Sequence, residues 1–255
     1  MSALPTFTRE QLQAMPEAEL NELHRLMAEL QRTTDREKLY SYYPDEGPLR
    51  RELYKKHVEF FSLGAIHKER LFCAANRSGK SVAGAYEVTC HLTGYYPPWW
   101  TGKRFDRAIN VMIAGDTAKT ARDILQFKML GPPGEFGTGM IPAANLVKTT
   151  PKPGIPDAVE TIYVKHAKGR QSRCQIKSYD QGREAFQGTE QHVVWFDEEV
   201  SQPLYVEGLM RTMTTNGICL LTFTPILGYT ELVQSFLESA DYGVATDPVL
   251  SALRG

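Results

Sequence analysis

The feature that most constrains the fold of this chain is the stretch AANRSGKSVAG at residues 74–84. An apolar run at residues 71–76 predicts a buried strand that leads into it, and apolar residues then recur at helical spacing until Gly94. A strand, a small-residue loop and a helix are the setting in which G-x-x-x-x-G-K-[ST] binds phosphates, because loop amides and a helix N-terminus converge on the anion. The context favours a phosphate-binding loop over a plain turn.

Two side chains of this loop would carry its chemistry. Lys80 would reach the β- and γ-phosphates, and the Ser81 hydroxyl would ligate Mg²⁺. Ala74 stands at the position of the first glycine; it is small enough for close approach, but a left-handed backbone would be less comfortable there. The residues expected to contact the nucleotide are Ala75, Asn76, Arg77, Ser78, Gly79, Lys80, Ser81 and Val82.

Further apolar runs alternate with helical patterns along the chain. The expected strands after the first are 108–115, 192–199 and 218–225. The expected helices after the first begin at Asp116 or Thr117 and at Pro203, and one covers 229–240. Near-continuous apolar strands alternating with helices indicate a mostly parallel sheet covered on both faces. The predicted fold class is therefore α/β, with helices flanking the sheet and a helical segment before it.

The strand at residues 192–199 ends in three adjacent carboxylates. Phosphoryl transfer needs a carboxylate for the metal, and hydrolysis benefits from a base that orients the attacking water. Asp197 suits the first role and Glu198 the second, whereas Glu199 is a bystander or a second polar contact. A solvated turn is the plainer interpretation of such a run, but the phosphate-binding loop upstream favours a paired site.

The N-terminal stretch at residues 16–32 predicts a helix with a proline at its start. Its apolar stripe consists of Leu20, Leu23, Met27 and Leu30. The stripe either packs against its own domain or docks a partner protein, and it is too short to indicate a coiled coil. A polar, Tyr-rich connector follows, so we divide the chain into a helical segment and connector at 1–45 and a phosphate-binding domain at 46–255.

The segment at residues 131–158 is rich in Gly and Pro and predicts a long surface loop. Residues 159–179 predict two strands joined near Lys168-Gly169, and no acidic residue occurs from 161 to 179. The cations of this hairpin are Lys165, Lys168, Arg170, Arg173 and Lys177. They could contact nucleic-acid phosphates without reading sequence, or form a solvated face.

Charge, apolar runs and cysteine spacing exclude several classes of protein. The formal net charge of -1 argues against a globally basic nucleic-acid coat. No apolar run approaches the ~20 residues that cross a bilayer, and the first residues lack the pattern of a signal peptide. The four cysteines are far apart, which favours buried reduced thiols, and the histidines show no metal-binding spacing.

Several of these blocks together resemble the ATPase half of the large terminase subunit of tailed bacteriophages, over roughly residues 40–235. The matching blocks are AANRSGKS, HLTGYYPPWWTGKRFDR, KSYDQGREAFQGT, VVWFDEE and LTFTP. The resemblance implies a P-loop NTPase fold of the ASCE, RecA-like class and an Mg²⁺-dependent ATPase that drives double-stranded DNA into a prohead. It also implies ATP and Mg²⁺ as ligands, and the host cytoplasm as location. The implied partners are DNA, the portal, the small terminase subunit and further copies in a ring, with no membrane.

The resemblance also implies roles for particular residues. Arg77 matches an arginine thought to sense or stabilise the γ-phosphate. TFTP resembles the coupling motif, whose strand is expected between the strands of the loop and of the carboxylates. Thr222 and Thr224 would then end near the γ-phosphate. The adenine is expected against residues 40–57, with Tyr43 and Arg51 as candidates to stack on it.

The chain departs from the family pattern at two places. Gln187 stands where many members have an arginine that acts on a neighbouring subunit's nucleotide, so we expect Arg183 to be the candidate for that role. No acidic cluster of the family's nuclease domain follows residue 225, so we expect an ATPase domain without DNA cleavage. A helicase-like remodelling ATPase, or a nucleotide-binding module without turnover, are the alternatives.

Overall fold

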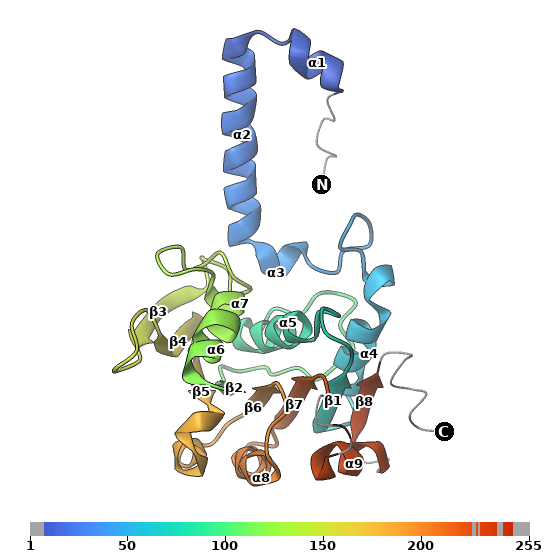
Figure 1. Cartoon of the computed structure of the whole chain (residues 1–255), viewed down its shortest axis with the longest axis vertical. Coiled ribbons are helices and arrows are strands. Elements are labelled where there is room, and N and C mark those ends of the chain that lie inside the picture. Colours follow the sequence, from blue (N-terminus) through green and yellow to red (C-terminus); the bar gives the residue numbers. More distant parts are fainter. Residues whose placement is uncertain (1–7, 226–227, 229, 239–241, 247–255) are drawn as a thin grey trace.

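The computed structural model describes residues 8–225, 228, 230–238 and 242–246. At its centre lies an eight-stranded sheet with the spatial order β3-β4-β5-β2-β6-β7-β1-β8 (Figure 1). The strands are β1 Glu69–Cys73, β2 Asn110–Gly115, β3 Leu146–Pro151, β4 Val159–Lys165, β5 Gln171–Ser178, β6 Val193–Asp197, β7 Ile218–Phe223 and β8 Gly243–Thr246. The strands from β5 to β8 in this order pair in parallel, whereas β3 and β4 form an antiparallel extension. The predicted mostly parallel α/β sheet is confirmed.

Helices cover both faces of the sheet. They are α1 Arg9–Ala14, α2 Glu17–Arg36, α3 Lys38–Ser41, α4 Lys55–Leu63, α5 Lys80–Thr93, α6 Ala118–Thr120, α7 Phe127–Leu130, α8 Gln202–Met210 and α9 Glu231–Glu238. Figure 1 shows α4, α5, α6 and α7 on one face and α8 and α9 on the other. Successive residues of a strand point to opposite faces, so Trp195 joins the apolar cluster under α5 and Phe196 the cluster under α8 and α9.

Two strands lie where the sequence indicates none. The segment predicted as a loop at 131–158 contains β3, which pairs antiparallel with β4. Its residues are half-buried or exposed, so the apolar pattern of a buried strand is missing. The C-terminal stretch contains β8, which pairs in parallel with β1. The hairpin at 159–179 is present as β4 and β5.

The N-terminal helix stands away from the body (Figure 1). The predicted helix at 16–32 is present as α2, but none of its described residues is buried. Within the stripe, Met27 and Leu30 are 59% and 41% exposed, and Leu20 and Leu23 are half-buried, so of the two alternatives the structure does not support packing of the stripe against its own domain. The body begins soon after α2, because Leu39 is fully buried in the core, six residues before the boundary expected from the sequence.

Two expectations drawn from composition can be compared with the structure. All four cysteines are buried and none of them forms a disulfide bond, as predicted. In the described ranges, none of the helices combines the length and the apolar character needed to cross a membrane.

A buried ionic network fixes α5 against β1. Arg70 donates to Glu87 at 2.5 Å and to the carbonyl of Phe60 at 2.6 Å, and His91 lies 3.2 Å from the same carboxylate. The three charged or titratable side chains are fully buried. Burial alone would raise the pKa of Glu87, but Arg70 and His91 outweigh it, so that this pKa lies below its usual value. Glu87 is therefore an anion held inside the core.

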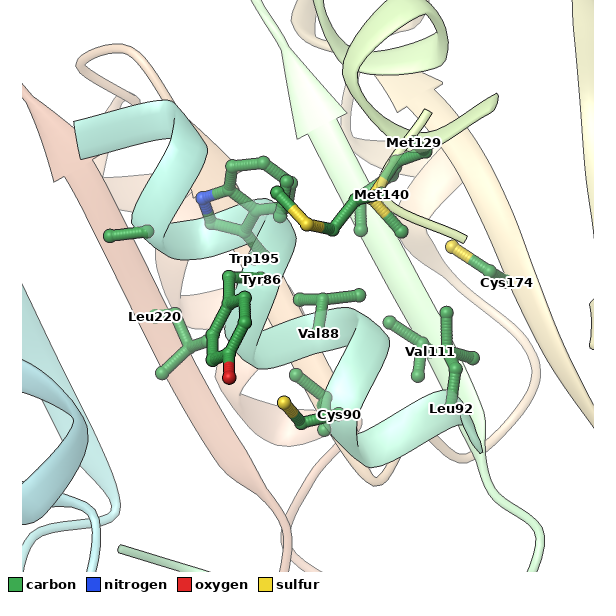
Figure 2. Close-up of a cluster of buried hydrophobic side chains, with 14 of the residues drawn as sticks. Tyr86, Val88, Cys90, Leu92, Val111, Met129, Met140, Cys174, Trp195 and Leu220 are labelled. Atoms are coloured by element: carbon green, nitrogen blue, oxygen red, sulfur yellow. The ribbon is translucent and has the colours of Figure 1, made fainter. Parts of the chain in front are cut away.

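The first half of α5 lies close to the sheet because a glycine faces a tryptophan. A Cβ atom at Gly84 would lie 2.4 Å from the indole of Trp195. Figure 2 shows this indole between α5 and the sheet, beside Tyr86 and Met140. The absence of a side chain at Gly84 therefore allows the helix to approach β6 closely.

We expect Gly84→Ala to destabilise the protein by about 1–3 kcal/mol, because the added methyl group overlaps a ring that is packed on all sides. Alanine would otherwise favour the helix by about 1 kcal/mol over glycine. The sign of the change in unfolding free energy therefore shows which of the two effects is larger. Urea unfolding of the variant beside the wild type measures it, and a stabilised variant would mean that the Trp195 ring can move aside.

Candidate functional site

The predicted phosphate-binding loop connects β1 to α5. Arg77 and Gly79 have left-handed backbones, with φ of 66° and 84°. Gly79 is the N-cap of α5 and makes no side-chain cap hydrogen bond. Ala74 is not among the residues with positive φ, so the glycine missing at this position imposes no strain. The loop thus presents the N-terminus of a 14-residue helix, the usual setting for binding an anion.

Lys80 ties the loop to the end of β7. Its Nζ atom donates to the carbonyls of Ala74 at 2.9 Å and Ala75 at 2.8 Å, and to Oγ1 of Thr224 at 2.8 Å. The side chain is only 7% exposed. Thr224 also lies 2.9 Å from the side-chain oxygen of Asn76. The ammonium group is therefore inside the loop and shared with the predicted coupling motif.

Asp197 lies buried at the end of β6 and faces Ser81. Thr222 donates to its carboxylate at 2.6 Å, and Trp195 donates to the Thr222 hydroxyl at 2.7 Å. Burial raises the pKa of Asp197 to about 6, while hydrogen bonds from Thr222 and Ser81 act in the opposite direction. A buried carboxylate next to a hydroxyl provides the oxygen ligands that Mg²⁺ prefers.

Glu198 follows with an unusual backbone. Its φ is 73°, a left-handed conformation that is uncommon for residues other than glycine. Its amide donates to the carbonyl of Thr222 at 3.0 Å, and its side chain is exposed. Glu199 instead accepts a hydrogen bond of 2.6 Å from Thr230, at the start of α9. The two neighbouring carboxylates therefore have different surroundings. That of Glu198 is exposed to solvent, whereas that of Glu199 is bonded to Thr230 and connects the end of β6 to α9.

The strand order brings the motifs together. β7 lies between β1 and β6, and Thr222 is paired with Asp197. This is the position expected for the coupling strand. Thr224 reaches the phosphate-binding loop, but Thr222 is 1% exposed and points to Asp197. The Thr222 hydroxyl orients the carboxylate of Asp197, and only Thr224 contacts the loop, so a position of both threonines near the γ-phosphate stays a prediction.

The two residues proposed to stack on the adenine are already engaged. Tyr43 is 1% exposed, and its hydroxyl lies 2.7 Å from Nδ1 of His57, whose Nε2 donates to the Ser78 carbonyl at 2.9 Å. Arg51 lies 5.3 Å from the centre of the Trp99 ring and pairs with Asp45. Tyr43 therefore contacts the loop through His57 and cannot present a ring face to a base. The prediction that Tyr43 stacks on the adenine is wrong.

A pocket of about 330 Å³ opens beside the loop instead. It is lined by Glu52, Leu53, Tyr54, Lys55, Lys56, His57, Phe72, Ala74 and Ser78. Tyr54 and His57 belong to the stretch 40–57 in which the base contacts were expected, whereas Phe72 belongs to β1. From the sequence alone, Tyr54 could not be told from the other tyrosines, because the distinction depends on which of them the core buries.

The cations of the hairpin gather on one side of the antiparallel extension. Lys165, Lys168 and Arg170 are exposed, and Arg173 of β5 lies opposite Tyr163 of β4. β3 adds a cation that the sequence did not single out: Nζ of Lys148 lies 4.8 Å from the centre of the Tyr163 ring. We call these five cations the basic face.

Arg183 lies in a short 3₁₀ turn that precedes β6. Its Nε atom donates to Glu207 of α8 at 2.8 Å, although its side chain is 60% exposed. Glu207 is 2% exposed and also pairs with Arg211 at 2.8 Å. Arg183 is therefore bound to a carboxylate of its own chain, and it would have to leave Glu207 to act elsewhere.

Residues 71–248 match the family model described as terminase large subunit, T4likevirus-type, N-terminal. The chain is 35% identical over 248 residues to the large terminase subunit of Salmonella phage P22, covering 89% of this chain and 48% of that protein. The chain thus spans about half the length of this curated relative.

Solved structures share the fold. The ATPase domain of the Thermus phage P74-26 large terminase matches with a TM-score of 0.53 and 17% identity, over 74% of this chain and 79% of that one. A point mutant of the same domain matches with a TM-score of 0.51 and 15% identity, over 73% and 80%. At these identities the likeness concerns the fold, that of a P-loop NTPase.

Proposed function

This chain belongs to the terminase large-subunit family, and from that membership we propose that it is the Mg²⁺-dependent ATPase module of a viral motor that drives double-stranded DNA into a prohead. One observation carries the proposal. Ser81 at the start of α5 faces Asp197 at the end of β6, and Lys80 donates to Thr224 just beyond β7, the strand that lies between β1 and β6. Such convergence at the carboxyl ends of parallel strands is the usual place for a ligand in an open α/β sheet.

The phosphates of ATP would bind at the N-terminus of α5. The amides of the loop and first helical turn would cradle them, and Lys80 would exchange its bonds to the loop carbonyls for the β- and γ-phosphates. Ser81 and Asp197 fit as the residues that hold Mg²⁺, given the buried carboxylate and adjacent hydroxyl. When bound, Mg²⁺ neutralises charge on the phosphates. Arg77, exposed on the loop, would contact the γ-phosphate.

Hydrolysis would rely on Glu198 as the base that orients the attacking water. Its carboxylate is exposed next to the metal ligand and, unlike that of Glu199, makes no structural contact with α9. Thr224 would report the state of the phosphates to β7, because it shares Lys80 with the loop. Arg183 is our candidate for an arginine that acts on the nucleotide of a neighbouring copy.

The adenine would occupy the pocket beside the loop. Tyr54 is half-buried and offers a ring surface there, whereas His57 and Phe72 are buried behind the pocket wall. Ala74 and Ser78 connect the pocket to the phosphate site. Aromatic rings can hold a purine by offset stacking. This assignment replaces Tyr43, whose ring is buried, whereas Arg51, whose side chain is 27% exposed, remains a candidate.

The basic face would contact the phosphate backbone of the DNA. Its cations lie on β3, β4 and β5 and in the turn between β4 and β5, and contacts from cations to phosphates do not depend on the base sequence. Further copies in a ring, the portal and the small terminase subunit complete the set of partners that we propose. The N-terminal helices, with the exposed side chains of Leu26, Met27 and Leu30, would be a separate segment from the ATPase domain.

The test is ATP hydrolysis by the wild type and by Glu198→Gln. We expect kcat to fall by at least about 10²-fold in the variant, because a general base contributes 10²–10⁴-fold, while ATP binding is retained. Glu199→Gln is the matched control: it changes the adjacent carboxylate, which bonds to Thr230, and should retain kcat.

Three outcomes would contradict the proposal. Unchanged hydrolysis in Glu198→Gln would remove the assigned base. A wild type that binds ATP but does not hydrolyse it at any protein concentration would favour the nucleotide-binding module. Unwinding of a tailed duplex would favour the helicase-like ATPase.

A further inference from the structure

The backbone at Glu198 must be held in place by its surroundings. A left-handed conformation at a residue other than glycine is sparsely populated, and it persists only where neighbouring groups fix it. The side chain of Glu198 makes no hydrogen bond or ion pair recorded among the described residues. The direction of its carboxylate therefore depends on the contacts that its backbone makes.

Two groups make those contacts. On one side, the amide of Glu198 donates to the carbonyl of Thr222 in β7 at 3.0 Å. On the other, the hydroxyl of Tyr179 lies 3.0 Å from the carbonyl oxygens of both Asp197 and Glu198. One phenol group thus spans the two peptide units that carry the proposed metal ligand and the proposed base.

Tyr179 is itself rigidly placed. It directly follows β5, and its amide donates to the carbonyl of Asp116 at 3.0 Å, at the end of β2. The next side chain, Asp180, accepts a hydrogen bond from the amide of Ala118 at 3.2 Å. The Tyr179 ring lies 6.1 Å from that of Phe196, centre to centre. These contacts hold the Tyr179 hydroxyl in place, and the hydroxyl in turn holds the backbone at Glu198.

The Tyr179 hydroxyl acts as a donor at this position. The oxygens within its reach are the carbonyls of Asp197 and Glu198 at 3.0 Å and the carbonyl of Ala114 at 3.4 Å, and a carbonyl oxygen can only accept.

We propose that Tyr179 is a positioning residue that fixes the Glu198 turn for hydrolysis. This inference rests on the proposed function, because it takes Glu198 as the base. Tyr179 does not touch the nucleotide in this scheme. It acts by holding the carbonyls of the two peptide units that flank Glu198, so its loss should affect turnover more than ATP binding.

Tyr179→Phe removes only the hydroxyl and is the direct test. We expect kcat for ATP hydrolysis to fall by about 10-fold to 100-fold, with KM and ATP affinity close to those of the wild type, as for a group that acts in the transition state. The matched control is Tyr96→Phe, which removes another partly buried hydroxyl, bonded to His91 and the Phe105 amide, far along the chain from Glu198. This control should retain kcat.

A double variant separates the inference from the proposed function. If Tyr179 acts through Glu198, Tyr179→Phe has no further effect on kcat in a Glu198→Gln background. An additive loss would overturn the inference, as would an unchanged kcat or a raised KM in Tyr179→Phe alone. Full activity in Glu198→Gln would instead overturn the proposed function.

A second substitution tests the role of Tyr179 if the Tyr179→Phe variant is unstable. If Tyr179→Phe does not fold, 3-fluorotyrosine incorporated at this position keeps the hydroxyl and changes only its strength as a donor. A shifted kcat with unchanged KM supports the inference, and an unchanged kcat overturns it.

Discussion

Replacing Lys80 with alanine should lower kcat/KM for ATP hydrolysis by at least about 10³-fold, the largest effect on activity that we expect from one substitution in this chain. The ammonium group is nearly buried and would act on phosphate oxygens in a site with little water, where a charge has a strong effect. Its three described hydrogen bonds also hold the loop and Thr224, so the variant loses both a ligand contact and the link between β7 and the loop.

The measurement is steady-state hydrolysis together with binding of a fluorescent ATP analogue. Binding should weaken in Lys80→Ala, in contrast to Glu198→Gln. Lys119→Ala, on the exposed helix α6, removes a cation without touching the loop and serves as the control. Hydrolysis within tenfold of the wild type in Lys80→Ala would exclude this lysine from the phosphate site.

Arg70→Met should destabilise the fold by about 3–5 kcal/mol, because it leaves Glu87 as an uncompensated charge inside the core. Arg70 provides two of the contacts that keep this carboxylate ionised, and neither side chain is exposed. Many domains have a total stability of only about 5–15 kcal/mol, so the variant should unfold at much lower urea concentration.

A second substitution and a pH series test the cause. Glu87→Leu added to Arg70→Met should recover part of the loss, since the buried charge is then gone. The folded-state pKa of Glu87 is lowered, so its ionisation contributes stability above the ordinary pKa of a glutamate, and the contribution disappears as the pH falls through the folded value. A double variant as unstable as Arg70→Met would mean that packing, and not charge, sets the cost.

The chemistry-bearing parts of the fold could be predicted because each is local. The loop at 74–84 and the carboxylates at 197–199 are short motifs between periodic segments, and their periodicity indicates strand or helix directly. The sequence also predicts that the loop and the carboxylates lie close together, because the carboxyl ends of parallel strands lie at the same edge of a sheet. The convergence of Ser81 with Asp197 and of Lys80 with Thr224 agrees with that expectation.

Other features depend on tertiary contacts that periodicity does not report. β3 has few apolar residues, so only its pairing with β4 identifies it as a strand. Tyr43 and Tyr54 share one Tyr-rich stretch, and only the core decides that the first is buried. The apolar stripe of α2 has the spacing of a packed helix, yet nothing in the described body covers it. The inference about Tyr179 depends on the left-handed backbone of Glu198, and no sequence pattern indicates that conformation.

The outer edge of the antiparallel extension also affects how copies of the chain can associate. β3 is the terminal strand, and it contains Lys148 and Pro151, with Lys152 immediately after it and two irregularities in its register with β4. Charged side chains, proline and bulges are the means by which edge strands avoid pairing with other sheets. Neighbouring copies should therefore not join their sheets into a continuous one through β3. Contacts there would be made by side chains, which can be released and re-formed without breaking a backbone ladder, and amyloid-like stacking from this edge is disfavoured.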